Sequence, residues 1–237
     1  MIIKQLKNFY TFGNLAILFQ SRRFNNNLSN NKMKPSQHLG DFVQAIILPL
    51  DAIKHGSIKG LKLADIEDQA CSKVCLHNQK HKGSCYVNNE INMGLKASHK
   101  LVKNPHLVQT QILLNPMFRF TVFGDVGRLN KKGKELILSL CNDEYKRLAY
   151  TADFHKKSMQ QFKPYFMASI QSIPQLIKAI SLGWTCYISD KASYHYAKDV
   201  LKLRLYKCPV DNDGLNQVFG CSTCPIQCNA QRHVVAR

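Results

Sequence analysis

Cysteine is the residue type whose spacing in this chain most directly suggests chemistry. Seven of the nine cysteines fall into two short stretches of the sequence. The first stretch carries Cys71, Cys75 and Cys85, and the second carries Cys208, Cys221, Cys224 and Cys228. Thiolates at such spacing can converge on one soft metal centre, either a zinc ion or an iron–sulfur cluster. The cysteine pattern therefore predicts a metalloprotein.

The second stretch has the spacing Cys-x12-Cys-x2-Cys-x3-Cys. Four thiolates complete a tetrahedral zinc site or ligate a [4Fe–4S] cluster, and a Cys-x2-Cys turn lets two sulfurs point at one ion. Pro225 follows Cys224, as a proline follows some cluster-binding cysteines. The spacing predicts a metal site here and leaves the choice between zinc and iron–sulfur open.

The first stretch has the spacing Cys-x3-Cys-x9-Cys. On a helical turn, Cys71 and Cys75 would face the same way. Three thiolates leave one coordination position open, as a reactive iron or zinc centre requires, and either His77 or His81 could instead close a zinc site. The remaining two cysteines, Cys141 and Cys186, lie in apolar stretches and are expected in the core.

Apolar runs alternate with helical patterns along most of the chain. Strands are expected at 42–50, 118–123, 147–151, 165–170, 184–188 and 201–206, and helices at 88–102, 131–141, 155–162, 173–182 and 191–199. Such alternation with short links is typical of a parallel sheet. The sequence therefore predicts an α/β fold, a partial (β/α) barrel with parallel strands, followed by a Cys-rich C-terminal metal-binding tail. An open doubly wound sheet is the alternative.

Three segments are expected on this basis. Residues 1–40 contain no Asp or Glu and include an Asn-rich run, which predicts a disordered basic arm. An organelle transit peptide, or a true start at Met33, would also explain this composition. Residues 41–207 would form the β/α domain that carries the first cysteine stretch, and residues 208–237 the Cys-rich C-terminal segment.

Polar residues follow the expected strands, where folds of this class place their functional groups. Gly124 and Asp125 follow the strand at 118–123; the glycine lets a ligand approach the backbone, and Asp125 supplies an acceptor or a catalytic base. The next two strands end in further polar groups, namely Thr151 and Asp153, and Ser169 and Gln171. We expect Gly124, Asp125, Thr151 and Ser169 to line a cofactor site.

The formal net charge of +18 favours a polyanionic partner, with nucleic acid as the default, although a compositional bias toward Lys and Asn would also raise the charge. The basic residues placed closest to the expected site, and therefore expected to contact nucleic acid, are Arg128, Lys131, Lys132 and Lys134. The sequence lacks a P-loop, a Gly-x-Gly-x-x-Gly turn and a nucleophile elbow, which argues against the enzyme classes that depend on them. No apolar run is long enough to span a membrane, and a cytoplasmic location is expected.

Several short motifs together resemble a known family. They are Cys85-Tyr86, the Arg-Phe-Thr-Val-Phe-Gly-Asp run that ends at Asp125, Ala149-Tyr150-Thr151, Met167-Ala168-Ser169-Ile170, the Ile-Gln-Ser-Ile-Pro helix ending in Gly183-Trp184, and the final Cys-Pro and Cys-x2-Cys array. Over about residues 65–230, this order resembles the phage and plasmid proteins of the "gene product 88" type. The resemblance implies a mobile-element origin.

A more distant similarity links the chain to radical S-adenosylmethionine enzymes. Their partial barrel has three cluster cysteines after an early strand and a glycine-rich turn after the next strand. The resemblance implies that Cys71, Cys75 and Cys85 hold an iron–sulfur cluster, that Gly124-Asp125 lies near S-adenosylmethionine, and that the C-terminal cysteines hold an auxiliary cluster. This chain differs from the family's Cys-x3-Cys-x2-Cys spacing and lacks its Gly-Gly-Glu-Pro turn.

Three functions are consistent with these patterns. The first is a metal- or iron–sulfur-binding β/α protein of a phage or plasmid that acts on or with nucleic acid. The second is a plasmid or phage replication protein that binds DNA and uses zinc structurally. The third is an iron–sulfur enzyme that acts on a small molecule. A steep loss of nucleic-acid affinity with added salt would distinguish the second function from the third.

Overall fold

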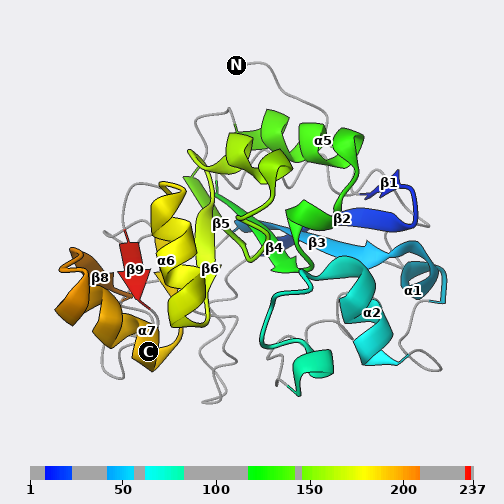
Figure 1. Cartoon of the computed structure of the whole chain (residues 1–237). Coiled ribbons are helices and arrows are strands. Elements are labelled where there is room, and N and C mark those ends of the chain that lie inside the picture. Colours follow the sequence, from blue (N-terminus) through cyan, green and yellow to red (C-terminus); the bar gives the residue numbers. More distant parts are fainter. Residues whose placement is uncertain are drawn as a thin grey trace, which may run out of the picture.

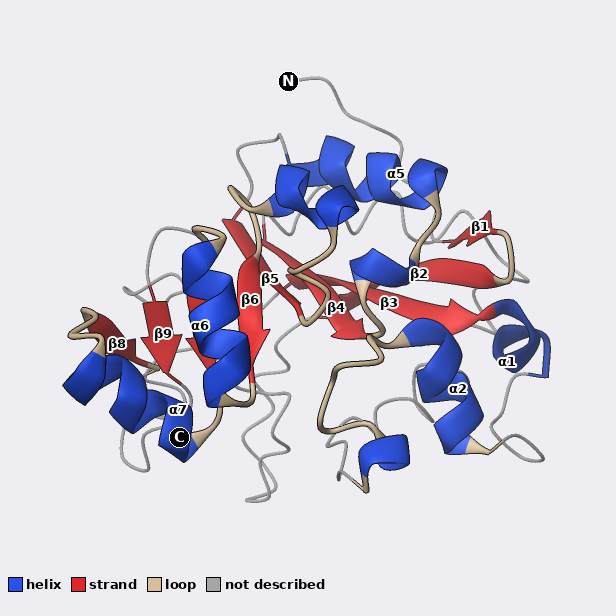
Figure 2. Cartoon of the chain, in the orientation of Figure 1, coloured by secondary structure: helices blue, strands red, loops and turns tan. Residues whose placement is uncertain are grey.

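The computed structural model describes residues 9–22, 42–55, 62–82, 117–141, 146–208 and 233–235. Its strands are β1 (Phe9–Phe12), β2 (Leu15–Arg22), β3 (Phe42–Pro49), β4 (Met117–Phe123), β5 (Lys146–Thr151), β6 (Met167–Ile170), β7 (Cys186–Ile188), β8 (Leu205–Lys207) and β9 (His233–Val235). Its α-helices are α1 (Leu50–His55), α2 (Leu63–Ala70), α5 (Lys131–Cys141), α6 (Ile173–Ser181) and α7 (Lys191–His195). Short helical turns are η2 (Gln79–His81), η4 (Val126–Arg128), η5 (Lys157–Phe162) and η6 (Tyr196–Val200) (Figure 2).

The strands form one mixed sheet in the order β1-β2-β3-β4-β5-β6-β7-β9-β8. Strand β2 pairs antiparallel with β1 on one side and with β3 on the other. Every later pairing is parallel. Figure 1 shows β1 and β8 at opposite ends of the sheet. The predicted α/β class with a mainly parallel sheet is therefore confirmed. Because the carboxyl ends of parallel strands share one edge, the loops after β3 to β7 gather there.

Residues 9–22 depart from the expectation of a disordered arm. They form β1 and β2, and β2 pairs with the whole length of β3. The side chains of Leu15 to Phe19 are at most 3% exposed. When this apolar run pairs with β3, it loses contact with water. The free energy gained by burying these side chains outweighs the entropy cost of ordering a basic, acid-poor segment.

Two further departures concern elements that the sequence did not reveal. No helix is expected between the strand at 42–50 and residue 88, yet α1 and α2 lie in this stretch. The expected C-terminal tail contributes β9, which inserts between β7 and β8. The expected helix at 88–102 lies outside the described residues. Among the helices that the structure describes, none combines the length and apolar character needed to cross a bilayer.

Helices α5 and α6 lie close to their expected positions because local signals mark their ends. The expected helix at 131–141 is α5, and Asn130 caps it by accepting a hydrogen bond from the Gly133 N–H at 3.0 Å. Helix α6 begins with Pro174 in its first turn, and Gly183, with a positive φ of 71°, follows its end. The core behind these helices is aromatic, with Phe120 stacked on Phe166 at 5.9 Å between ring centroids.

Candidate metal-binding and polar site at the strand ends

The turn after β4 brings the sheet into contact with residues 70–82, the cysteine segment, which carries Cys71 and Cys75. The Asp125 N–H donates a 2.8 Å hydrogen bond to the carbonyl oxygen of Ala70, the residue before Cys71. Gly124 has a positive φ of 80°, and a Cβ there would lie 2.6 Å from the carbonyl oxygen of Ile47 and 3.2 Å from that of Ala70. Only glycine fits this turn, both because of its conformation and because two main chains approach it so closely.

The side chain of Asp125 is buried beneath this turn. Its carboxylate accepts hydrogen bonds of 2.8 Å from the Gly127 N–H, the Thr151 hydroxyl and the Ala152 N–H. Burial, and next the negative charge of Asp153, raise the pKa of Asp125, while the three donors act in the opposite direction. The geometry makes Asp125 and Thr151 a brace between the loops after β4 and β5. A role for Asp125 as a proton acceptor stays a prediction.

Asp153 joins the loop after β5 to the cysteine segment. Its two carboxylate oxygens accept 2.6 Å hydrogen bonds, one from the Ser72 hydroxyl and the other from the Lys156 ammonium. Ser72 and Asp153 are each only 1% exposed. A Cβ on Gly127 would meet the Asp153 carboxylate, so this second glycine is required for the close approach. Two charge-assisted contacts, a buried one from Ser72 and a part-buried one from Lys156, therefore fix this point of the site.

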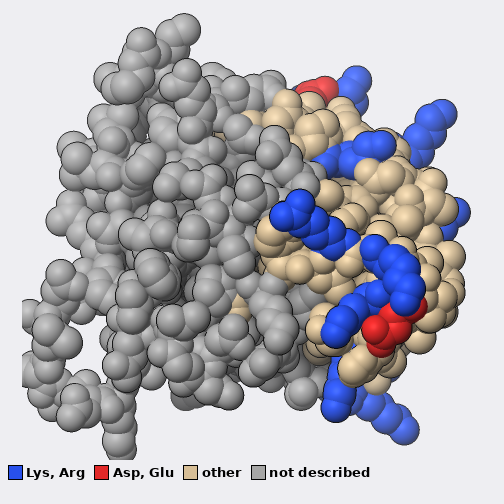
Figure 3. Space-filling view, turned by 90° about the vertical axis from the view of Figure 1, so that its left-hand side faces the viewer, with Lys and Arg blue, Asp and Glu red and all other residues tan. Residues whose placement is uncertain are grey.

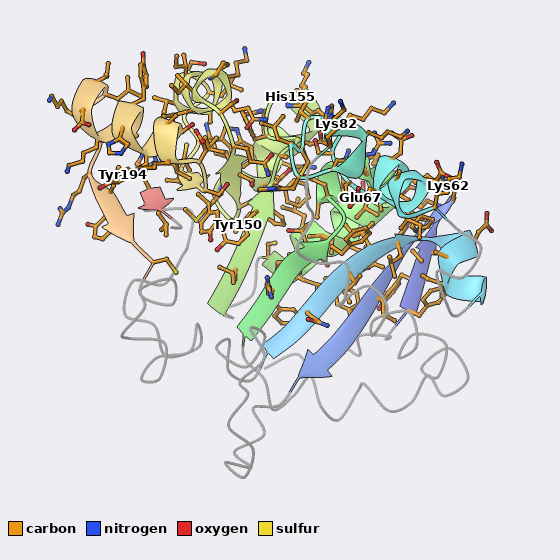
Figure 4. All side chains as sticks on the ribbon, turned by 90° about the horizontal axis from the view of Figure 1, so that it is seen from below. Lys62, Glu67, Lys82, Tyr150, His155 and Tyr194 are labelled. Atoms are coloured by element: carbon orange, nitrogen blue, oxygen red, sulfur yellow. The ribbon has the colours of Figure 1, made fainter. Side chains whose placement is uncertain are left out.

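The loop after β6 holds the other end of the cysteine segment. The Leu76 N–H donates to Gln171 Oε1 at 2.6 Å, and Gln171 Nε2 lies 3.6 Å from Cys75 Sγ. Gln175, in α6, donates from Nε2 to the Val74 carbonyl oxygen at 3.0 Å. Residues 70–76 are thus tied to the loops after three consecutive parallel strands, β4, β5 and β6. In Figure 4, Lys82, at the end of the described cysteine segment, and His155, in the loop after β5, both lie toward the upper ends of the strands.

Cys71 and Cys75 do not lie on a common helical turn, the arrangement in which they would face the same way. Helix α2 ends at Ala70, and Cys71 is already extended, with φ −97° and ψ 159°. A tight turn then follows, in which the Cys75 N–H donates to the Ser72 carbonyl oxygen at 3.2 Å. Both cysteines are half-buried, and the third residue of this set, Cys85, lies outside the described residues.

The two histidines proposed as alternative ligands are both exposed. His81 Nε2 lies 2.7 Å from the Lys73 carbonyl oxygen, so a contact within the loop already engages this ring nitrogen. Across the residues that the structure describes, no group of three or more His, Cys, Asp or Glu side chains is arranged to hold a metal ion. The expected zinc or iron–sulfur centres therefore stay predictions.

The remaining cysteines divide into two groups. Cys141 and Cys186 are buried in the core, as predicted, and burial raises the pKa of the Cys186 thiol to about 12. Cys208 follows β8 and is half-buried. Its predicted co-ligands Cys221, Cys224 and Cys228 lie outside the described residues.

The basic residues predicted to contact nucleic acid have different surroundings. Arg128 donates from its guanidinium to the carbonyl oxygens of Asp68 and Gln69 at 3.0 and 3.3 Å, where it complements the C-terminal end of α2. Lys134 donates to the Ser158 hydroxyl at 3.0 Å, and burial, followed by the charge of Lys156, lowers its pKa.

Lys131 and Lys132, in contrast, are exposed at the start of α5. The side chain of Lys131 is 91% exposed and lies 3.9 Å from Glu135. Figure 3 shows the side of the molecule on which β8 lies in Figure 1, where Lys and Arg side chains cover more of the described surface than acidic ones do.

Sequence reasoning found part of this site and missed part of it. The sequence predicts Asp125, Thr151, Asp153 and Gln171 as polar residues at strand ends, and they lie there, whereas Ser169 lies half-buried within β6. The missed residues are Ser72, Lys156 and Gln175. Ser72 directly follows Cys71, and that adjacency was the one signal that could have drawn attention to it.

Comparisons with protein-family models, with curated proteins and with solved structures give no match to this chain.

Proposed function

We propose that this chain is a metal-binding β/α protein whose reactive centre lies at the carboxyl ends of β3 to β6, with Cys71, Cys75 and Cys85 as thiolate ligands. The observation that carries the proposal is the attachment of residues 70–76 to the loops after three consecutive parallel strands. Parallel α/β folds bind substrates and cofactors at this edge of the sheet.

The donor chemistry of the segment fits a soft metal. Cys71 and Cys75 are half-buried, and Cys75 Sγ faces an amide donor rather than an acceptor, as a thiolate ligand requires. Three thiolates would leave one position for substrate or a small cofactor, and an iron–sulfur cluster or zinc ion would supply the electron transfer or Lewis acidity there. The residues of this chain would orient the ligands through Ser72, Asp153 and Gln171.

A partial (β/α) barrel is part of the same proposal. Strands β3 to β7 are neighbours in sequence order, and right-handed crossovers between such strands place the connecting helices on one side. A doubly wound sheet instead reverses its strand order at a switch point. The sequential order of β3 to β7 supports a partial barrel, and with it the similarity to radical S-adenosylmethionine enzymes.

Metal analysis of anaerobically purified protein tests the proposal. We expect iron with sulfide and a brown colour, or zinc without colour, and loss of one centre in the Cys71→Ser, Cys75→Ser variant. The matched control is Cys141→Ser, which removes a buried core thiol and should leave metal content unchanged. Equal metal content in the wild type and the double variant would overturn the assignment. If iron is present, reductive cleavage of S-adenosylmethionine is the next assay.

The second candidate function is DNA or RNA binding, as in the phage and plasmid replication proteins considered above. The observation that favours it is the net charge of +18 together with two exposed lysines, Lys131 and Lys132, beside the strand ends. Both lysines lie in the first turn of α5, where the helix dipole disfavours cations, so local helix stability does not account for them.

Binding of a fluorescent single-stranded oligonucleotide at several salt concentrations tests this candidate. Lys131→Gln with Lys132→Gln should reduce the slope of log affinity against log salt by roughly one to two. Lys191→Gln with Lys198→Gln, two exposed lysines of α7 and η6, is the matched control. A protein that shows no binding at low salt, or equal slopes for both variants, would contradict a nucleic-acid role for the first pair.

A further inference from the structure

The amide of Gln171 has a fixed orientation beside Cys75. The Leu76 N–H can only donate, and it lies 2.6 Å from one end of this amide, which must therefore be the oxygen. The other end, Nε2, then faces Cys75 Sγ at 3.6 Å as a hydrogen-bond donor. The sulfur of Cys75 is consequently the acceptor in this contact.

A second glutamine holds the first one in place. The Gln171 N–H donates to Gln175 Oε1 at 2.9 Å, and Gln175 Nε2 donates to the Val74 carbonyl oxygen at 3.0 Å. The residues on both sides of Cys75 are therefore bound, Val74 by Gln175 and Leu76 by Gln171. This glutamine pair, Gln171 and Gln175, determines where the Cys75 sulfur lies and which group it faces.

We propose that Gln171 is a positioning residue that tunes Cys75 as a metal ligand, an inference that rests on the metal-centre proposal above. A donor to a ligating sulfur draws electron density away from the metal–sulfur bond. Hydrogen bonds to cysteine sulfurs are among the factors that set the reduction potential of iron–sulfur clusters. In a zinc site, the same contact lowers the electron donation of the thiolate and helps to fix its direction.

The two glutamines provide a matched pair of variants. Gln171→Glu keeps an oxygen for the Leu76 N–H and removes the donor to Cys75. Gln175→Glu keeps an oxygen for the Gln171 N–H and removes the donor to Val74. Both variants add the same charge to the same neighbourhood, but only the first changes a contact to sulfur. Gln171→Met removes the donor without adding charge and serves as the second variant.

Cobalt(II) added to the metal-free full-length protein is the probe, and the sulfur-to-cobalt charge-transfer band is the readout. Subtracting the spectrum of the corresponding Cys75→Ser protein isolates the contribution of this thiolate. In Gln171→Glu and Gln171→Met, we expect the band to move to longer wavelength and cobalt affinity to fall roughly 10-fold. Gln175→Glu should keep the wild-type band position, even where its affinity falls.

Two results would overturn the inference. If the band keeps its wild-type position in both Gln171 variants, with urea midpoints showing that they fold, Gln171 does not tune the sulfur, although the metal centre stands. If wild-type protein gives no Cys75-dependent band at all, the metal-centre proposal fails, and the tuning role fails with it.

Discussion

The hydrogen bond between Ser72 and Asp153 is the most direct test of how the cysteine segment is attached to the sheet. It joins residues 81 positions apart, is 2.6 Å long, and connects two side chains that are each 1% exposed. Hydrogen bonds to charged groups contribute about 1.5–3 kcal/mol. Because this one is short and buried, we expect a coupling free energy of about 2 kcal/mol between the two side chains.

A double-mutant cycle isolates that coupling. Ser72→Ala should lower the free energy of unfolding by about 2 kcal/mol, because it leaves a carboxylate oxygen without a donor. Asp153→Ala also removes the ion pair with Lys156, whose side chain is 34% exposed and can turn to water, so we expect about 3 kcal/mol. The double variant should lose about 3 kcal/mol, not the sum, because the contact is removed only once.

Urea unfolding followed by tryptophan fluorescence measures all four proteins. The chain has one tryptophan, Trp184, which is 1% exposed and reports on the core. Ser181→Ala is the control, since the Ser181 hydroxyl donates to the Lys178 carbonyl oxygen at the exposed end of α6. Its coupling to Asp153→Ala should fall within about 0.5 kcal/mol of zero. A coupling of that small size for Ser72 as well would refute the Ser72–Asp153 hydrogen bond as a contact that stabilises the cysteine segment on the sheet.

Three other predictions concern the same region. Gly124→Ala should destabilise the protein by about 2–5 kcal/mol in urea unfolding, whereas Gly13→Ala, at a positive φ with no atom within 4 Å of a new Cβ, should cost only about 1 kcal/mol. The pKa of Asp125 is raised, so its stabilising contribution is complete below the unfolded-state pKa and is lost as pH rises through the folded-state pKa. The stability of wild type relative to Asp125→Asn should therefore increase on acidification. Urea titrations at several pH values would show this difference. Iodoacetamide at pH 8 should modify Cys75 well before Cys186, whose thiol has a pKa of about 12, and mass spectrometry of the native protein over time would give the order.

The sequence allows the central strands to be predicted because their signals are local. Buried parallel strands appear as short, nearly continuous apolar runs, and β3 and β4 lie within one residue of the expected bounds. Pro174 and Gly183 mark the ends of α6. Each of these features can be read without knowledge of what lies next to it in space.

Strands β2 and β9, which lie next to the two edge strands, could not be predicted because they depend on distant partners. The apolar run within β2 is visible in the sequence, but only its antiparallel pairing with β3 distinguishes it from a short apolar stretch in a disordered arm. Strand β9 is three residues long and is defined by pairing with β7 and β8. Pairing over such separations leaves no local pattern.

In the candidate site, too, the polar side chains could be predicted from the sequence but their contact partners could not. Asp125, Asp153 and Gln171 could be predicted as strand-end polar groups, because strand ends and polar side chains are both visible in the sequence. Their partners could not be predicted, since Ser72 and Leu76 approach them only after the chain has folded back over the sheet. Arg128 illustrates this limit, because its guanidinium donates to carbonyl oxygens at the end of α2, a contact that leaves no local pattern in the sequence.

The energetics of the cysteine segment indicate what a metal would add. Between residues 71 and 82, Ser72 and Asn78 are buried, whereas Val74 and Leu76 are 38% and 43% exposed. The described segment therefore gains little from apolar burial, and polar contacts to Asp153, Gln171 and Gln175 hold it in place. Segments with few apolar contacts open more easily than the core. A metal bound by Cys71 and Cys75 would supply binding free energy to a segment that gains little from apolar burial. If such a metal is bound, its removal should expose this segment to hydrogen exchange while the core around Trp184 stays protected.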